Sequence, residues 1–230
     1  MNINRILGAA LLLGLVSGVS AQTASNAGTV QRVTGNAVII GTDNAQRPAT
    51  ARETVRSGES IRTEAGGEVL VRMVDDSSVA LRQNTLFQFT EVRHERRATD
   101  SFLSNLARGS ARIVSGLIGR QNPGGVRVNA ATATIGIRGT DFEVAVIEED
   151  GPQARAGVYN HVYDGRTNIS LAQGPATDVQ RRQTAFAPQR PNPGEEALQI
   201  LRDTPIFIQQ GGGLDALIQS INVPPPMIFR

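Results

Sequence analysis

Apolar and polar residues alternate with a period of two over much of the chain, which is the pattern of half-buried β-strands. Val69, Val71 and Met73 share one face of such a segment, and Phe87 and Phe89 repeat the same period further on. Turn-forming residues such as the pair Gly66-Gly67 separate these segments about every ten residues. The pattern predicts an all-β fold of many short strands, in a compact β-helix-like or sandwich arrangement.

The same alternation is found on both sides of this region. Two short strands separated at Gly35 are predicted in residues 28–40, and further strands follow between residues 111 and 186. Asp164-Gly165 predicts a hairpin turn, and residues 179–186 form the last predicted strand. Residues 99–108 fit a short helix and a strand equally well, whereas the Gly- and Pro-rich residues 116–126 indicate a loop.

The N-terminal residues have the order of a secretory signal peptide. Arg5 precedes an apolar run over residues 6–16, and small residues at Val19 and Ala21 provide a cleavage site. The rival interpretation is an uncleaved membrane anchor, but residues 6–21 are fewer than the roughly 20 apolar residues that span a bilayer. We therefore expect an exported, periplasmic protein with no stable membrane insertion after cleavage.

The domain organisation follows from these shifts in composition. We assign residues 1–21 to the signal peptide, 22–27 to a lead-in, 28–187 to the β domain and 188–230 to a Pro/Gly-rich linker and tail. The tail is predicted to be partly helical, with one short helix in residues 195–202. Four apolar residues at helical spacing either pack on the domain or dock on a partner: Leu214, Leu217, Ile218 and Ile221.

Composition excludes several chemistries. The 230 residues include no cysteine, so disulfides, thiolate nucleophiles and Cys-ligated metals are absent. The isoelectric point of 9.9 reflects the absence of lysine, because the net charge is only +2. A nucleic-acid partner is therefore not expected.

Arginines cluster between residues 91 and 127, where Arg93, Arg96 and Arg97 are close together. Such a cluster is a candidate surface for an anionic polymer. It is more typical of a solvated strand face and loop.

No catalytic constellation is evident. His94 and His161 lack a metal-ligand partner at i+2 or i+4, and the acidic runs at residues 75–76 and 148–150 place neighbouring carboxylates on opposite faces of a strand. The chain contains neither a G-x-S-x-G nor an S-x-x-K motif. We predict that the protein is not an enzyme and binds no cofactor or metal.

The stretch TATIGIRGTDFEVAV, residues 132–146, combines two predicted strands with an unusual amount of turn-forming sequence. Gly136 and Gly139 permit either a positive φ or a close backbone approach where the chain bends. Between and beside them, Arg138 can pair with Asp141 across the bend, and Thr140 belongs to the same turn. Arg138 and Asp141 are the leading interaction candidates, with Arg93, Arg96 and Arg97.

Three segments together resemble the FecR-domain family, in the same order and with similar spacing. They are ETVRSGESIRTEAGGEVLVRMVDDSSVALRQNTLFQF, RGSARIVSGLIG and TATIGIRGTDFEV. The resemblance, from about residue 28 to residue 186, implies a periplasmic all-β module that supplies no catalytic residue. In the founding regulators this module passes a signal from an outer-membrane transporter to a cytoplasmic sigma factor. Here only a signal peptide precedes the module, so a free-standing role is expected.

Two functions are compatible with these features. The first is a non-catalytic interaction or scaffold module that contacts an envelope protein, in cell-surface signalling, through a sheet edge, the Arg138 bend or the tail. The alternative is binding of a cell-envelope polysaccharide or another anionic polymer along the Arg-rich surface. Carbohydrate sites often stack sugars on aromatic rings, and the chain has no Trp and only Tyr159 and Tyr163 as tyrosines.

Overall fold

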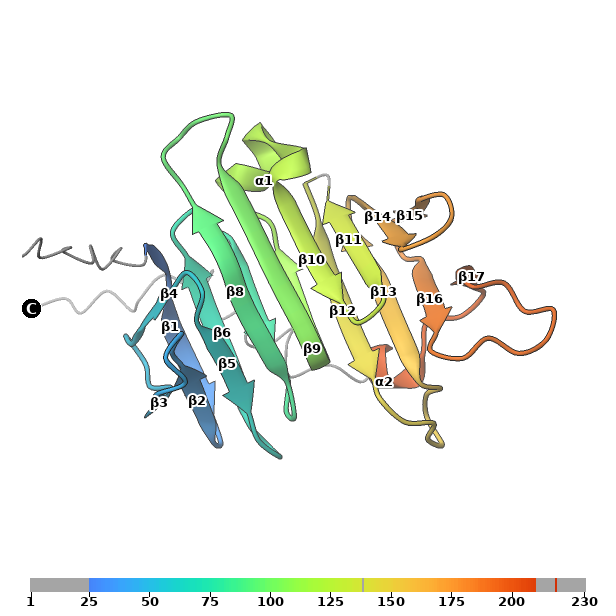
Figure 1. Ribbon diagram of the computed structural model, residues 1–230, viewed down its shortest axis with the longest axis horizontal. Coiled ribbons are helices and arrows are strands. Elements are labelled where there is room, and N and C mark those ends of the chain that lie inside the picture. The colour runs from blue at the N-terminus through green and yellow to red at the C-terminus, as the bar shows by residue number, and fades with distance from the viewer. Residues whose placement is uncertain (1–24, 138, 210–217, 219–230) are drawn as a thin grey trace, which may run out of the picture.

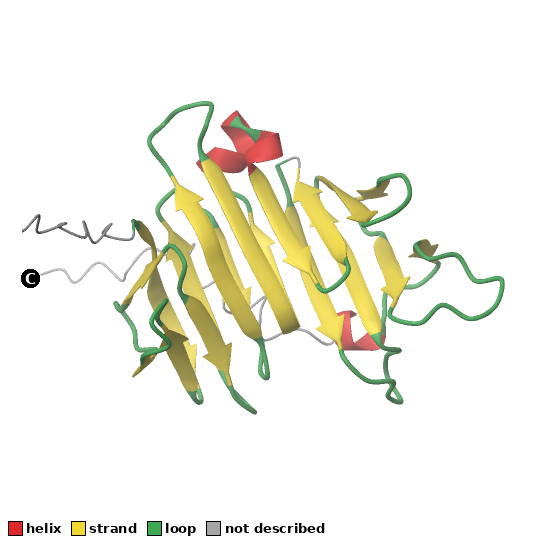
Figure 2. Ribbon diagram, in the orientation of Figure 1, coloured by secondary structure: helices red, strands yellow, loops and turns green. Residues whose placement is uncertain are grey.

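The computed structural model describes residues 25–137, 139–209 and 218, and most of its regular structure is β-strand (Figure 2). The strands are β1 (Asn26–Thr34), β2 (Ala37–Ile40), β3 (Gln46–Pro48), β4 (Thr54–Arg56), β5 (Ser60–Thr63), β6 (Glu68–Met73), β7 (Ser78–Leu81), β8 (Leu86–Arg93), β9 (Ser101–Val114), β10 (Val126–Ala130), β11 (Ala133–Ile137), β12 (Asp141–Ile147), β13 (Gly157–Asp164), β14 (Arg166–Leu171), β15 (Thr177–Gln180), β16 (Thr184–Pro188) and β17 (Gln199–Leu201). The helices among the described residues are short: α1 (Leu117–Gln121), the 3-10 turn η1 (Pro123–Gly125) and α2 (Ile206–Gln209). The predicted all-β class is confirmed.

The strands form two layers that share β9 (Figure 1). Layer A has the order β4-β1-β6-β7-β9-β12-β13-β16-β17. Layer B has the order β3-β2-β5-β8-β9-β10-β11-β14-β15. Among the described strands only β9 and β10 pair in parallel. A β-helix stacks parallel strands, so of the two predicted arrangements the sandwich is the one formed.

The core lies between the layers and is built by the alternation seen in the sequence. Layer A contributes Val71 and Phe142, and layer B contributes Phe87 and Ile135, each fully buried in one cluster. The Phe87 and Phe89 rings pack edge to face with centroids 5.0 Å apart. The predicted inward faces of residues 69–73 and 87–89 are confirmed.

Strand β9 passes from layer B to layer A at Gly109. Residues up to Arg108 pair with β8, and residues from Gly109 onward pair with β12. Gly109 has φ +84°, and a Cβ there would lie 2.3 Å from Oγ1 of Thr85, so only glycine fits the kink. The ambiguous residues 99–108 are therefore strand from Ser101 onward.

The loop predicted for residues 116–126 is wrong, because this segment contains α1 and η1. The backbone carbonyl of Asp75 accepts a hydrogen bond from Leu117 N, 2.8 Å, and the Asp75 carboxylate accepts one from Ile118 N, 3.2 Å. Ile118 is fully buried in the core. A contact 43 residues away in the chain thus supports a helical turn that the local sequence does not favour.

The predicted hairpin at Asp164-Gly165 is also wrong. Gly165 has the expected positive φ, +79°, but the chain crosses between layers there. Strand β13 pairs with β12 and β16, whereas β14 pairs with β11 and β15. The single strand predicted for residues 179–186 is likewise two strands, β15 and β16, in different layers.

The C-terminal part of the described chain packs on the outer face of layer A. The helix predicted for residues 195–202 is wrong, because β17 forms there and pairs with β16. Ile208, on α2, contacts Ala145 and Phe186, and Ile218 packs against Leu70 and Ala80. Of the four tail residues, Ile218 therefore packs on the domain; Leu214, Leu217 and Ile221 lie outside the described residues, as does the predicted signal peptide. None of the helices described is long and apolar enough to cross a bilayer.

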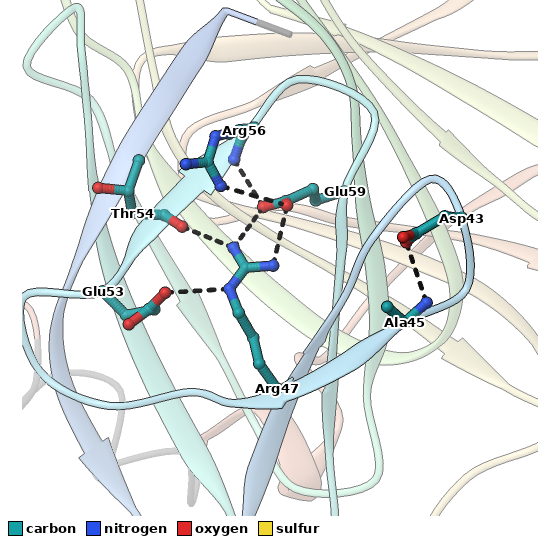
Figure 3. A network of polar contacts seen from close by, with 7 residues as sticks. All are labelled: Asp43, Ala45, Arg47, Glu53, Thr54, Arg56 and Glu59. Atoms are coloured by element: carbon teal, nitrogen blue, oxygen red, sulfur yellow. Dashed lines mark hydrogen bonds and ion pairs between the residues drawn. The ribbon is translucent and has the colours of Figure 1, made fainter. Parts of the chain in front are cut away.

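At one end of the sandwich, Arg47 on β3 of layer B hydrogen-bonds to residues of both layers (Figure 3). Its guanidinium donates two hydrogen bonds to the Glu59 carboxylate, at 2.9 and 2.8 Å, and one to Glu53 at 3.0 Å. It also donates to the Thr54 carbonyl at the start of β4, in layer A, at 2.8 Å. Burial alone would raise the pKa of Glu59, but the hydrogen bonds from Arg47 and the Arg56 amide outweigh it and lower that pKa. The arginine thus joins the edge strands of both layers.

Candidate interaction site at the layer crossing

The glycine-rich segment 136–141 is a crossing from one layer to the other. β11 ends in layer B at Ile137, and β12 begins in layer A at Asp141. Gly139 has φ +62°, and a Cβ there would meet no atom within 4 Å, so glycine is favoured for its backbone conformation alone. Gly136 has a different reason, since a Cβ there would lie 2.4 Å from Oδ1 of Asn168 on the neighbouring strand. Both alternatives expected for these glycines occur, one at each position.

A second crossing, from β13 to β14, packs directly against the first. Thr140 Oγ1 donates to the Arg166 carbonyl at 2.8 Å, and the Thr140 amide donates to Ser115 Oγ at 2.7 Å. Thr140 is buried. One of the three segments that carry the family resemblance thus forms a corner in the fold, which its neighbours hold in place.

Asp141 is held by an arginine from the adjacent strand. Arg112, on β9, donates from Nε and Nη2 to the two carboxylate oxygens of Asp141, both at 2.8 Å. The Arg112 guanidinium also lies over the Tyr163 ring, 3.8 Å from its centroid. Arg138, the predicted partner of Asp141, lies outside the described residues, so that pairing stays a prediction.

Glu143 is the centre of a buried polar cluster on the outer face of layer A. Its side chain is 0% exposed and accepts hydrogen bonds from Arg82 Nε and Nη2, at 2.8 and 3.1 Å. Ser110 Oγ and the Tyr163 hydroxyl donate to the same carboxylate, at 2.5 and 2.8 Å. Burial, followed by the nearby Glu143 charge, raises the pKa of Tyr163. The cluster joins β9, β12, β13 and the residue that follows β7, and both oxygens of the Glu143 carboxylate accept hydrogen bonds.

His161, on β13, lies beside the Glu143 cluster on the outer face of layer A. It is the cross-strand neighbour of Glu143, and its Nδ1 lies 2.8 Å from Thr184 Oγ1. Burial lowers the pKa of His161, so the neutral ring is favoured. Among the described residues, no buried side-chain nitrogen or oxygen lacks a hydrogen-bond partner. The arrangement stabilises the sheet through contacts between neighbouring strands.

Sequence reasoning missed Arg82, Glu143, Tyr163 and His161 as a group. Arg82 and Glu143 are 61 residues apart, and no local motif joins them. The only signal was that polar residues occupy the outward positions of strands whose inward positions are apolar.

The Arg-rich candidates lie far from the crossing. Arg93 pairs with Ser101 at the first residue of the 14-residue β9, whereas Asp141 pairs with Val114 at its last. The side chains of Arg93 and Arg97 are 50% and 70% exposed, and their nearest acids are Glu91 at 3.6 Å and Glu95 at 2.8 Å. The structure does not bring these arginines together with Asp141.

The turn that carries Arg96 is organised by a buried carboxylate. Arg96 has φ +61°, and its amide and that of Glu95 donate to Asp100, both at 2.9 Å. Burial alone would raise the pKa of Asp100, but these amide bonds and His94 outweigh it and lower that pKa. The Asp100 carboxylate therefore stabilises the backbone conformation of this turn.

The described surface has several hollows, and one of them is lined in part by Arg93, His94 and Glu95 of the Arg-rich turn. A second, next to the crossing, is lined by Pro123, Gly124, Val126, Arg127, Gly136, Ile137 and Asn168, without a carboxylate. A third includes the acidic residues 148–150 and Arg155, whose guanidinium binds Glu195 at 2.6 Å. Within residues 25–137 and 139–209, no group of three or more His, Cys, Asp or Glu is placed to hold a metal ion.

Comparison with known proteins identifies the family. The FecR protein family matches residues 59–174, just over half of the chain. The chain belongs to the FecR protein family. No curated protein matches the sequence.

Solved structures resemble the fold only distantly. Two crystal structures of a candidate anti-sigma factor from Parabacteroides distasonis ATCC 8503 are each 16% identical, with a TM-score of 0.49 over 63% of this chain. The chain spans 59% of the length of that protein. A cell surface anchoring domain is 18% identical, with a TM-score of 0.26 over 27% of this chain and 82% of that one.

Proposed function

We propose that this protein is a non-catalytic, periplasmic interaction module of the FecR type that contacts an envelope protein in cell-surface signalling. Membership of the FecR family supports the signalling role. The saturated Glu143 cluster supports a scaffold rather than a catalyst, because an acid with four hydrogen-bond donors around it is poorly placed to take a proton from a substrate.

Export is proposed from the N-terminal sequence. Arg5, the apolar residues 6–16 and the small residues before Gln22 have the order of a signal peptide. Mass spectrometry of the protein purified from the periplasmic fraction tests this step. A mature chain that begins near Gln22 is expected, and an intact Met1 in the membrane fraction would contradict it.

The observation that carries the protein-partner proposal is the exposed end of layer A. β17 is one of the two edge strands of this layer, and among the described strands it pairs only with β16. Ile200, in β17, is 38% exposed and Ile206, at the start of α2, is 55% exposed. Aliphatic anchors beside an unpaired strand edge suit a partner that adds an extended segment to the sheet.

Site-specific photo-crosslinking in the native host tests this surface. A photoreactive amino acid at position 200 is expected to yield one defined adduct with an envelope protein, identified by mass spectrometry. The same amino acid at the exposed position 97 is the matched control and is expected to yield none. Ile200→Glu and Ile206→Glu should reduce recovery of the identified partner. Adducts that are equal at both positions, or absent at position 200, would refute this partner surface.

The anionic-polymer alternative rests on Arg93, Arg96 and Arg97, whose exposed side chains are accessible. A salt-sensitive interaction with heparin that Arg93→Ala and Arg97→Ala remove together would favour it. Its absence at low salt would exclude it.

A further inference from the structure

The outer face of layer B has a continuous row of uncharged hydrogen-bonding side chains. Cross-strand register places one such residue on each of six adjacent strands, β5, β8, β9, β10, β11 and β14. In order they are Ser60, Gln88, Asn105, Asn129, Thr134 and Ser170. Neighbouring strands are about 4.8 Å apart, so the row extends about 24 Å across the sheet.

Each residue of the row is accessible. All six are half-buried or exposed, whereas the corresponding positions of layer A, such as Glu143 and Tyr159, are buried. Ile208 packs beside Tyr159 and Ile218 beside Leu70 on layer A, and Glu143 is covered by its hydrogen-bond donors Arg82 and Tyr163. Layer B therefore offers the open broad face of the sandwich, as far as the described residues show.

The row retains unused hydrogen-bonding capacity. Within the described chain, Gln88 donates to the Gly58 carbonyl at 3.2 Å, and Thr134 Oγ1 donates to Asn129 Oδ1 at 3.0 Å. The side chain of Asn105, at the centre of the row, makes no hydrogen bond to another described residue. An amide has two donors and an acceptor with two lone pairs, so these side chains can each bind further polar groups.

A hollow lies beside the row at the layer crossing. Arg127, Gly136 and Asn168 occupy the adjacent register positions on β10, β11 and β14, and all three line the hollow. Asn168 Oδ1 lies 2.4 Å from the position that a Cβ on Gly136 would occupy, so the Asn168 side chain packs over Gly136 beside the row. A sugar hydroxyl at this side of the row would therefore meet the Asn168 amide and the Arg127 side chain, both of which line the hollow.

We propose that this face of layer B binds a linear, uncharged polysaccharide that lies along the row from Ser60 to Ser170. A chain of sugars presents hydroxyl and amide groups at regular intervals, which matches a row of amides and hydroxyls. A protein partner would need apolar anchors, and the exposed large hydrophobic residues of the described chain, Val74, Ile200 and Ile206, do not belong to the row. An anionic polymer would need a positive row, but the six residues are neutral. This function goes beyond the contact with an envelope protein at β17 and uses the opposite layer.

The test uses the mature full-length chain and three soluble probes: chitohexaose, cellohexaose and heparin. Isothermal titration or amide chemical-shift changes are expected to show saturable binding of at least one neutral oligosaccharide, unaffected by salt. The shifted amides should belong to β8, β9, β10 and β11. Failure of both neutral probes to bind, or binding of heparin alone, overturns the proposal.

Matched variants locate the site. Asn105→Ala and Asn129→Ala should each weaken binding about fivefold, and the double variant more than tenfold, because each removes hydrogen bonds to the ligand. Gln31→Ala changes an exposed amide on β1 of layer A and should leave affinity unchanged. Asn129 is exposed, so its variant is expected to fold even if the Asn105 variant does not.

Equal affinity of the wild-type, Asn129→Ala and Gln31→Ala proteins for the oligosaccharide overturns the proposal. Dimerisation of the protein through this face, measured by sedimentation, also overturns it. Photo-crosslinking at position 200 should persist in the Asn129 variant, which separates this site from the partner surface.

Discussion

The backbone carbonyl oxygen of Gly139 lies 2.3 Å from the position that a Cβ atom on Gly165 would occupy. These two residues belong to different crossings, β11 to β12 and β13 to β14, which pack back to back. Gly165 also has φ +79° and Gly139 has φ +62°. The crossing that bears the family motif is therefore shaped as much by its neighbour as by its own sequence.

Three glycine-to-alanine substitutions separate contact from backbone conformation. Gly165→Ala should destabilise the protein by about 3 kcal/mol, because it adds a clash to an unfavourable φ. Gly139→Ala should cost about 1 kcal/mol, since only its φ is unfavourable. Gly151→Ala, where a Cβ would meet its nearest atom at 3.9 Å, should change stability by less than about 0.5 kcal/mol. Urea unfolding measures all three, and an equal cost for Gly165 and Gly139 would contradict the close packing.

Removal of the buried carboxylate should be far more costly than removal of an exposed one. Glu143→Ala leaves Arg82, Ser110 and Tyr163 without their shared acceptor, and we expect a loss of about 3 kcal/mol or more. Glu148→Ala, at an exposed position, is the control and should change stability by less than about 0.5 kcal/mol.

A double-mutant cycle separates the pair from the rest of the cluster. Arg82→Ala combined with Glu143→Ala should cost less than the sum of the single changes, because neither charge is then left unpaired. Additive costs in denaturant unfolding would show that the two residues do not interact.

Stability should fall with acid through His161. Burial lowers the pKa of His161 in the folded protein, so below about pH 6.5 the unfolded chain binds the proton first. The stabilisation is present above that pH and is lost as pH falls toward the lowered folded pKa. His161→Gln removes this titration, so its free energy of unfolding should change less between pH 7 and about pH 5.5. Parallel pH profiles for the variant and the wild type would contradict the shift.

The Arg47 cluster should control fraying of the sandwich end. Arg47→Ala removes the hydrogen bonds to Glu53, Thr54 and Glu59, and we expect a loss of about 1–2 kcal/mol. Hydrogen exchange should accelerate in β3 and β4, at the edges of both layers, while the core strand β9 keeps its protection. Arg190→Ala, an exposed arginine beyond β16, is the control. Uniform acceleration in every strand would indicate global unfolding instead.

Some of the candidate site was predictable, and some was not. The period of two identified most of the strands and the inward faces of Phe87 and Phe89, and the glycines at positions 136 and 139 marked a bend. The buried acceptor Glu143 was not recognised, because its donors come from β9, β13 and the residue after β7, all distant in the sequence. Helix α1 was missed for a similar reason, since Asp75 supports it from outside the segment.

The sequence by itself determined most of the β-strands, several of the positions where the chain turns, and the family, because alternation and glycine are local properties of the chain. Only the tertiary structure decided which strands pair, that the Asp164-Gly165 turn connects two layers, and that one face of the sandwich is covered while the other is open. Pairing and coverage depend on contacts between residues far apart in the chain. Their free energies come from burial and hydrogen bonding between strands, which no single segment encodes.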